Sequence, residues 1–172
     1  MKAFLVGFEP IIAINAKLLI LGTMPSTTSI NLQQYYGHPR NAFWPIMSAL
    51  LNANLDTSYL SRKNWLINNN IAVWDVLQHC QRSGSLDANI NLTTAKTNDF
   101  SYLYNKYPTI KQVFFNGKLA EKYYKQHVLP AVINQFSYLE YQYLPSTSPA
   151  YAALKLEQKI EAWKAINQSM VK

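Results

Sequence analysis

The sequence predicts an α/β fold: a three-layer αβα sandwich around a central four-stranded, largely parallel sheet. Short apolar stretches typical of buried strands alternate along the chain with segments of helical periodicity, and this alternation indicates βαβ units. The chain has 172 residues, of which 49% are hydrophobic and 15% are charged. This length and composition fit one globular domain, residues 1–172, that buries a sizeable core.

Four stretches are predicted to be strands, because each is short, apolar and bounded by turn residues. The first runs into Gly22 and Pro25, and the last is closed by a Pro-Ser-Thr-Ser-Pro loop that starts at Pro145. The four stretches are residues 18–21, 71–77, 112–117 and 138–144.

Helices are predicted between these strands at residues 41–51, 58–68, 99–107 and 118–128. A final helix is the clearest, because its apolar residues recur at steps of three and four and form one stripe. These residues are Leu156, Ile160, Trp163, Ile166 and Met170. The polar segment 78–97 is predicted to be a long loop, and loops of that length in a compact domain are usually functional or disordered.

The predicted topology also places the functional site. In open α/β sheets ligands bind at the carboxyl ends of the strands. The loops that begin at Gly22, Leu77 and Pro145 are therefore expected to line the site.

The charge balance is compatible with a polyanionic partner. The formal net charge is +7, from 16 Lys and Arg against 9 Asp and Glu, and the pI is near 9.4. Nucleic acid is the first such partner to consider, although a basic balance also serves solubility alone.

Several classes of site are not expected. Cys80 is the one cysteine, so an internal disulfide framework is excluded and no cysteine cluster is available for a metal. The histidines His38, His79 and His127 lack ligand spacing, so no metal and no cofactor are predicted. The N-terminal segment has no continuous apolar run, so we expect neither a signal peptide nor a membrane span. A cytoplasmic, nucleoid-associated location is the expectation.

One block stands out: residues 34–44, Gln-Tyr-Tyr-Gly-His-Pro-Arg-Asn-Ala-Phe-Trp. Aromatic faces can sandwich a base, an arginine can contact a phosphate, and an amide can orient a water or contact a base edge. Local structural roles compete with these. Trp44 is expected to be a core residue, and Asn41 is either a helix N-cap or a catalytic group.

Together with four other motifs, this block resembles the uracil DNA glycosylase superfamily, and most closely its hypoxanthine (deoxyinosine) DNA glycosylases. The other motifs are Trp-Asp-Val-Leu at 74–77, Gly-Ser-Leu-Asp at 84–87, Phe-Asn-Gly at 115–117 and Leu-Pro-Ser-Thr-Ser-Pro at 144–149. The resemblance spans nearly the whole chain. It implies a monofunctional enzyme that flips a deaminated base, most often hypoxanthine, out of DNA and hydrolyses its N-glycosidic bond in base excision repair.

The resemblance also distributes roles among the residues. Met24 occupies the position where the wider superfamily keeps a water-orienting asparagine, so Asn41 is predicted to hold the water instead. Phe43 is predicted to stack on the base, and His38 is assigned to catalysis, either donating to the purine or a phosphate or simply packing on Pro39. The base-binding set is Gly22, Thr23, Met24, Pro25, Tyr36, Phe43, Asn116 and Ser146, and the DNA-binding set is Arg40, Ser148 and Tyr151.

Several residues have alternative roles that the sequence does not decide between. Asn116 either contacts the polar edge of the base or forms a turn with Gly117. Asp75 is a cap or an acid near the site, and Asp87 orders the polar loop or acts electrostatically. Tyr151 is the residue proposed to insert into the duplex.

Two other functions compete with this prediction. One is a glycosylase for uracil or thymine mismatches, and Met24 argues against strong uracil activity. The other is a non-catalytic nucleic-acid-binding module, and the retained Asn41 argues against that. The expected partner is DNA that contains a deaminated base, no membrane is involved, and the chain is expected to be a monomer.

Overall fold

The central sheet of the computed structural model, which describes residues 3–171, has four parallel strands in the order β3-β2-β6-β7. Their bounds are Leu18–Gly22 for β2, Ile71–Asp75 for β3, Gln112–Asn116 for β6 and Glu140–Leu144 for β7. The register pairs Leu18 with both Ile71 and Gln112, so β2, β3 and β6 start level. All four predicted central strands are therefore present.

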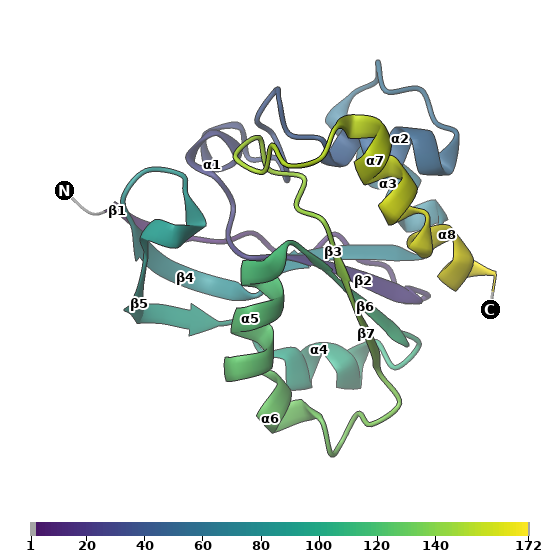
Figure 1. Cartoon of the computed structure of the whole chain (residues 1–172). Coiled ribbons are helices and arrows are strands. Elements are labelled where there is room, and N and C mark those ends of the chain that lie inside the picture. Colours follow the sequence, from purple (N-terminus) through teal and green to yellow (C-terminus); the bar gives the residue numbers. More distant parts are fainter. Residues whose placement is uncertain (1–2, 172) are drawn as a thin grey trace.

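The strands β2, β3 and β6 are largely apolar because the sheet is covered on both faces, whereas β7 keeps exposed polar residues. Every residue of β2 and of β3 is buried, as expected for a parallel sheet with helices on each side. On one side lie α2 (Phe43–Leu51), α3 (Tyr59–Asn68), α7 (Leu156–Trp163) and α8 (Ala165–Met170), and on the other lie α4 (Phe100–Lys106), α5 (Lys118–His127) and α6 (Leu129–Val132) (Figure 1). This arrangement confirms the three-layer αβα prediction.

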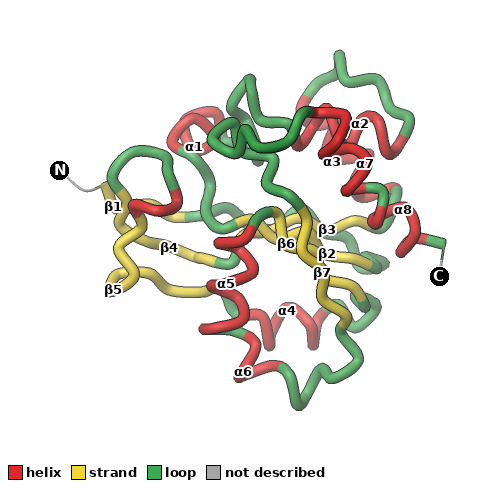
Figure 2. Tube along the Cα trace, viewed as in Figure 1, coloured by secondary structure: helices red, strands yellow, loops and turns green. Residues whose placement is uncertain are grey.

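A second sheet corrects the prediction of a long loop at 78–97. In that segment β4 (Leu77–Arg82) and β5 (Ile90–Thr97) form an antiparallel pair, and β1 (Ala3–Val6) joins the other edge of β4. Figure 2 shows these three strands beside the central sheet. The segment looked like a loop because only scattered residues, such as Leu77, Cys80 and Ile90, are buried.

Short connections link these elements near the carboxyl edge of the central sheet. The helix α1 (Thr27–Leu32) follows β2 and begins at Ser26, whose side chain accepts a hydrogen bond from the backbone N–H of Ser29. A short 3₁₀ helix, η1 (Asp87–Asn89), lies between β4 and β5. Neither α1 nor β1 was predicted from the sequence.

The predicted C-terminal stripe is divided between two helices, α7 and α8, that meet at Lys164. Trp163 and Ile166 are fully buried, whereas Leu156 is 41% exposed. The stripe therefore faces the core only in its central part. No helix among residues 3–171 is long and apolar enough to cross a membrane.

Candidate active site

A cavity of about 90 Å³ lies at the carboxyl ends of the parallel strands. One buried water requires roughly 10–15 Å³ of such volume, so the cavity accepts a group larger than a single water. Predicted site residues in its wall are Gly22, Thr23, Met24, Pro25, Tyr36, Asn41, Asn116, Ser146 and Ser148. The chain thus brings together the loops that follow β2 and β7, as the topology led us to expect, with the ends of β3 and β6.

The loop after β2 can enter this wall because residue 22 has no side chain. A Cβ on Gly22 would lie 2.5 Å from Asp75 Oδ1 and 3.1 Å from Tyr36 Oη. Real Cβ atoms do not approach oxygen so closely, so glycine allows the Asp75 carboxyl and the Tyr36 hydroxyl to converge here. Met24 is buried in the same wall.

Asp75 and Tyr36 bring two unpaired polar atoms to the cavity. Asp75 Oδ2 and Tyr36 Oη are buried, and neither has a hydrogen-bond partner in the described part of the chain. Burial raises the pKa of Asp75 to about 8, the charge of Asp87 adds to the rise, and Arg82 partly offsets it. Burial also raises the pKa of the Tyr36 hydroxyl. At neutral pH both groups are therefore mostly protonated and can donate a hydrogen bond to a ligand.

The aromatic residues that line the cavity are Tyr35 and Tyr36, which corrects the prediction for Phe43. Phe43 is fully buried and is not part of the cavity wall. Its ring stacks on Tyr36, with centroids 4.0 Å apart and planes at 19°, and Trp163 meets it edge-on. Tyr36 has a φ of 54°, so the backbone turns there and places its ring over Phe43.

Asn41 lines the cavity and also bonds to the first residue of a helix. Its Oδ1 accepts a hydrogen bond of 2.9 Å from the backbone N–H of Phe43, the first residue of α2. The capping alternative raised from the sequence is met only in part, because the N-cap position is Ala42 and Asn41, one residue earlier, bonds the first N–H of the helix. A carbonyl oxygen has two lone pairs, so this bond leaves Asn41 a second acceptor position and both amide hydrogens.

The comparisons with known proteins show the family of this chain. The model of the uracil DNA glycosylase superfamily matches residues 9–169. The chain belongs to this superfamily. It is 35% identical to a hypoxanthine DNA glycosylase of Methanosarcina acetivorans over 161 residues. This alignment covers 93% of this chain and 96% of that protein.

Two further relatives support the same assignment. A hypoxanthine DNA glycosylase of Methanosarcina barkeri is 39% identical over 118 residues, 68% of this chain and 73% of that protein. A solution structure from Methanosarcina acetivorans, provisionally named a uracil DNA glycosylase, superposes with a TM-score of 0.81 at 31% identity and covers 99% of this chain and 100% of its own. The family resemblance of the sequence motifs is thus confirmed, and DNA glycosylase is the class of enzyme to which the chain belongs.

In this superfamily member, His38 does not line the cavity. Its Nδ1 accepts a hydrogen bond of 3.1 Å from the backbone N–H of Arg40, and its carbonyl accepts one of 2.9 Å from the N–H of Asn41. The histidine therefore shapes the turn that presents Asn41. Arg40 is exposed and directly precedes the cavity residue Asn41 in the chain.

The Pro-Ser loop of this glycosylase is fastened to the sheet through Asn116. Asn116 Nδ2 donates to Thr147 Oγ1, and the Thr147 N–H donates to Asn116 Oδ1, both at 2.9 Å. The Thr147 carbonyl accepts from the N–H of Ala42. Asn116 thus braces the cavity wall, a role that neither sequence-based alternative included. Trp44, as predicted, is a core residue, and its Nε1–H donates to the carbonyl of Tyr35.

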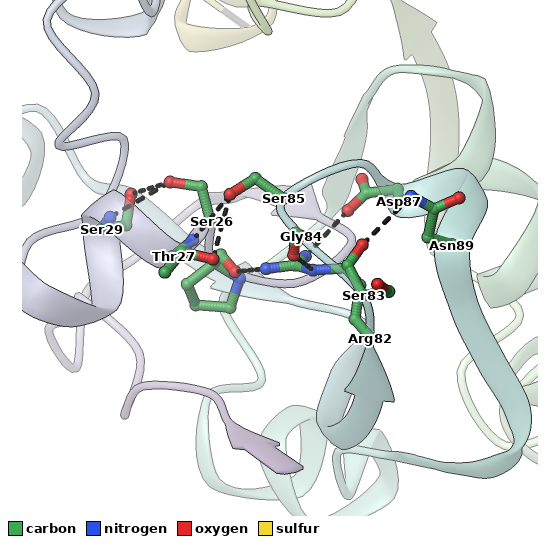
Figure 3. A network of polar contacts seen from close by, with 10 residues as sticks. Ser26, Thr27, Ser29, Arg82, Ser83, Gly84, Ser85, Asp87 and Asn89 are labelled. Atoms are coloured by element: carbon green, nitrogen blue, oxygen red, sulfur yellow. Dashed lines mark hydrogen bonds and ion pairs between the residues drawn. The ribbon is translucent and has the colours of Figure 1, made fainter. Parts of the chain in front are cut away.

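Sequence reasoning missed Arg82, whose side chain is fully buried below the loop that follows β2. Its guanidinium donates to the Pro25 carbonyl at 2.6 Å, to the Gly84 carbonyl at 3.0 Å and to Asp87 Oδ1 at 3.2 Å (Figure 3). Burial raises the pKa of Asp87, and Arg82 opposes that rise. The one available signal was spacing, because Cys80 and Arg82 stand two apart and so share a face of β4.

Asp87 also lines the cavity, together with Ser85, so the turn after β4 forms part of the wall. This agrees with the expectation that the chain after Leu77 contributes to the site. Among residues 3–171, no group of three or more His, Cys, Asp or Glu side chains is arranged to hold a metal ion.

Proposed function

We propose that the chain hydrolyses the N-glycosidic bond of hypoxanthine in DNA. The observation that carries this proposal is the pair of unpaired buried oxygens, Asp75 Oδ2 and Tyr36 Oη, in the wall of the cavity. Buried polar groups are nearly always hydrogen-bonded, so such a pair calls for a ligand. The two relatives named hypoxanthine DNA glycosylase indicate which ligand to test first.

The chemistry of Asp75 suits a deaminated purine. A protonated carboxyl has one donor and one acceptor side by side: its carbonyl oxygen can accept from the N1–H of hypoxanthine, and its O–H can donate to O6. Adenine presents the reverse order, an acceptor at N1 and a donor at N6, so the carboxyl discriminates between the two bases only if its proton is fixed on one oxygen. A pKa of about 8 keeps Asp75 mostly protonated at pH 7.

The proposed reaction begins when the nucleotide leaves the duplex, which costs about a few kcal/mol and less where pairing is weak. The glycosidic bond then breaks through an oxocarbenium-like state. Asn41 orients the attacking water with the amide positions that its bond to Phe43 leaves open. Backbone N–H groups of the loop after Gly22 stabilise negative charge on the departing purine.

The proposed reaction is hydrolysis without a covalent enzyme intermediate. No lysine is among the residues that line the cavity, and a Schiff base to the sugar requires an amine nucleophile. We therefore expect borohydride to trap no covalent complex with inosine-containing DNA.

The decisive experiment is a base-release panel. Oligonucleotides that contain one inosine, uracil or xanthine are incubated with the enzyme, and the free base is quantified. Hypoxanthine release at a rate at least about tenfold above the other two supports the proposal, because the matched hydrogen bonds of a polar site discriminate strongly. Release of uracil alone, or binding without release of any base, contradicts it.

Asn41 is tested with two variants that separate its roles. Asn41→Asp keeps an acceptor for the Phe43 N–H, whereas Asn41→Ala removes both the cap and the water contact. We expect each variant to lower the single-turnover rate of hypoxanthine release by about 100-fold or more, because a displaced reactant loses its attack geometry. Binding of the inosine duplex should persist in Asn41→Ala. A wild-type rate in Asn41→Ala would restrict Asn41 to capping.

A further inference from the structure

The turn between β4 and η1 carries an exposed leucine at the rim of the cavity. Leu86 is 54% exposed, and the residues on either side of it, Ser85 and Asp87, both line the cavity. A single exposed leucine is ordinary on a protein surface. Leu86, however, lies between two cavity residues, and this position suggests a role at the site.

A groove of about 300 Å³ continues from the cavity past Leu86. The groove and the cavity share wall residues, including Thr23, Asn116 and Ser146. Beyond the shared wall, the groove is lined by Leu86, by Lys118 at the start of α5 and by Tyr151. Leu86 therefore lies where the cavity opens toward a surface that includes Lys118, a cationic side chain that suits a polyanion such as DNA.

The turn that carries Leu86 is fastened on both sides. Before it, the Arg82 guanidinium bonds to the carbonyls of Gly84 and Pro25, and after it the same guanidinium pairs with Asp87. Ser85 Oγ also donates to Thr27 Oγ1 and accepts from the Thr27 N–H (Figure 3). The leucine is thus held at a fixed place relative to the loop that follows β2.

A base that leaves the duplex leaves a gap in the base stack, and the gap favours its return. Proteins that open base steps fill such gaps with apolar wedges, and leucine is among the residues they use. A wedge needs an apolar side chain that is exposed before binding, lies next to the pocket that receives the base, and belongs to a rigid turn. Leu86 meets all three requirements.

Tyr151, the wedge suggested by the sequence, is more constrained. Its N–H donates to the Ser148 carbonyl, its carbonyl accepts from Lys159 Nζ at 2.8 Å, and the same ammonium lies 5.2 Å from its ring centroid. Tyr151 is half-buried in the loop that precedes α7. We propose that Leu86, rather than Tyr151, enters the base stack and takes the place of the flipped nucleotide. This inference rests on the proposed glycosylase function.

The test compares two substrates in the Leu86→Ala variant. Single-turnover release of hypoxanthine is measured from an inosine·cytosine duplex and from the same inosine strand without its complement. We expect the duplex rate to fall by about tenfold or more, because the gap is no longer filled, and the single-strand rate to stay within about twofold, because no partner strand holds that base. Leu86→Met should recover most of the duplex rate. Leu92→Ala, on exposed β5, is the matched control.

A second measurement follows flipping without requiring bond cleavage. A 2-aminopurine placed next to the inosine brightens when its neighbour unstacks, and Leu86→Ala should reduce this rise at least about threefold. Equal losses on both substrates, an unchanged duplex rate, or a duplex-specific loss in Tyr151→Ala but not in Leu86→Ala would each overturn the inference. A wild-type enzyme that releases no hypoxanthine refutes the proposed function instead, and the fluorescence rise then decides the role of Leu86.

Discussion

At the scale of single residues, the cavity depends on the missing side chain of Gly22. We expect Gly22→Ala to destabilise the protein by about 1–3 kcal/mol, a usual cost of overpacking, because its Cβ would meet Asp75 Oδ1 at 2.5 Å. Urea unfolding measures this cost. In an Asp75→Ala background the clash is removed, so the same substitution should cost clearly less. Additive costs would show that the two residues do not interact.

Asp75 also makes stability depend on pH. Its pKa of about 8 in the folded protein lies above the value of about 3.9 in an unfolded chain. Between these two pH values the folded protein keeps a proton that the unfolded chain releases. The contribution of Asp75 to the free energy of unfolding is therefore complete below about pH 4 and is lost as the pH rises toward 8. The loss is at most about 1.4 kcal/mol per pH unit.

The variant Asp75→Asn removes this titration while keeping the shape of the side chain. We expect its free energy of unfolding, relative to that of wild type, to rise between pH 5 and pH 8. Denaturant unfolding at several pH values measures the difference, and other carboxyl groups cancel in the comparison. Parallel curves for the two proteins would mean that Asp75 is ionised in the folded state.

Neighbouring residues show how far the site could be predicted from the sequence. Asn41 was expected at the site and lines the cavity. Phe43, two positions later, was expected to face the base and is buried under Tyr36. The difference depends on the positive φ of Tyr36. The spacing of residues in the sequence does not predict such a backbone conformation, so it does not predict which of the two rings faces the cavity.

At the scale of elements, the β4–β5 hairpin holds the cavity wall in place. Its buried Arg82 joins the turn after β4 to the Pro25 carbonyl and to Asp87. We expect Arg82→Met to destabilise the protein by about 3–5 kcal/mol, because Asp87 is left without its partner, and to slow base release as the Pro25 loop loosens. Thermal unfolding and single-turnover rates measure the two effects.

An exposed ion pair supplies the control for Arg82. Lys164 and Glu161 lie 2.6 Å apart, and their side chains are 52% and 72% exposed. Lys164→Met should cost no more than about 1 kcal/mol, as is usual for surface pairs. If Arg82→Met cost no more than this control, the Arg82 network would not hold the hairpin to the central sheet.

The same hairpin shows where element prediction failed. The central strands were found because burial on both faces makes them continuously apolar, as in Leu18–Gly22. In β4 only part of each strand face is buried, and β-bulges interrupt its pairing with β5 at His79. Alternation therefore breaks down, and polar composition alone resembles that of a loop.

At the scale of the whole molecule, the parallel sheet gathers four strand ends at one edge. The order β3-β2-β6-β7 places Gly22, Asp75 and Asn116 at adjacent strand ends, although they are far apart in sequence. This convergence could be predicted because parallel topology dictates it. The closing contacts between side chains, such as that of Asn116 with Thr147, depend on loop geometry and could not.

DNA binding should then depend on charge at this edge and not on the net charge of +7 alone. Each phosphate that a cationic side chain neutralises adds about −0.9 to the slope of log affinity against log salt concentration.

Arg40 is exposed beside the cavity, whereas Lys106 is exposed on α4, across the sheet from α2 (Figure 1). We expect Arg40→Gln to make the slope for an inosine duplex shallower by about one, and Lys106→Gln, which removes the same charge, to leave it unchanged. Fluorescence anisotropy titrations between about 50 and 200 mM salt measure both slopes. Equal changes in the two variants would mean that DNA responds to total charge and that Arg40 contacts no phosphate.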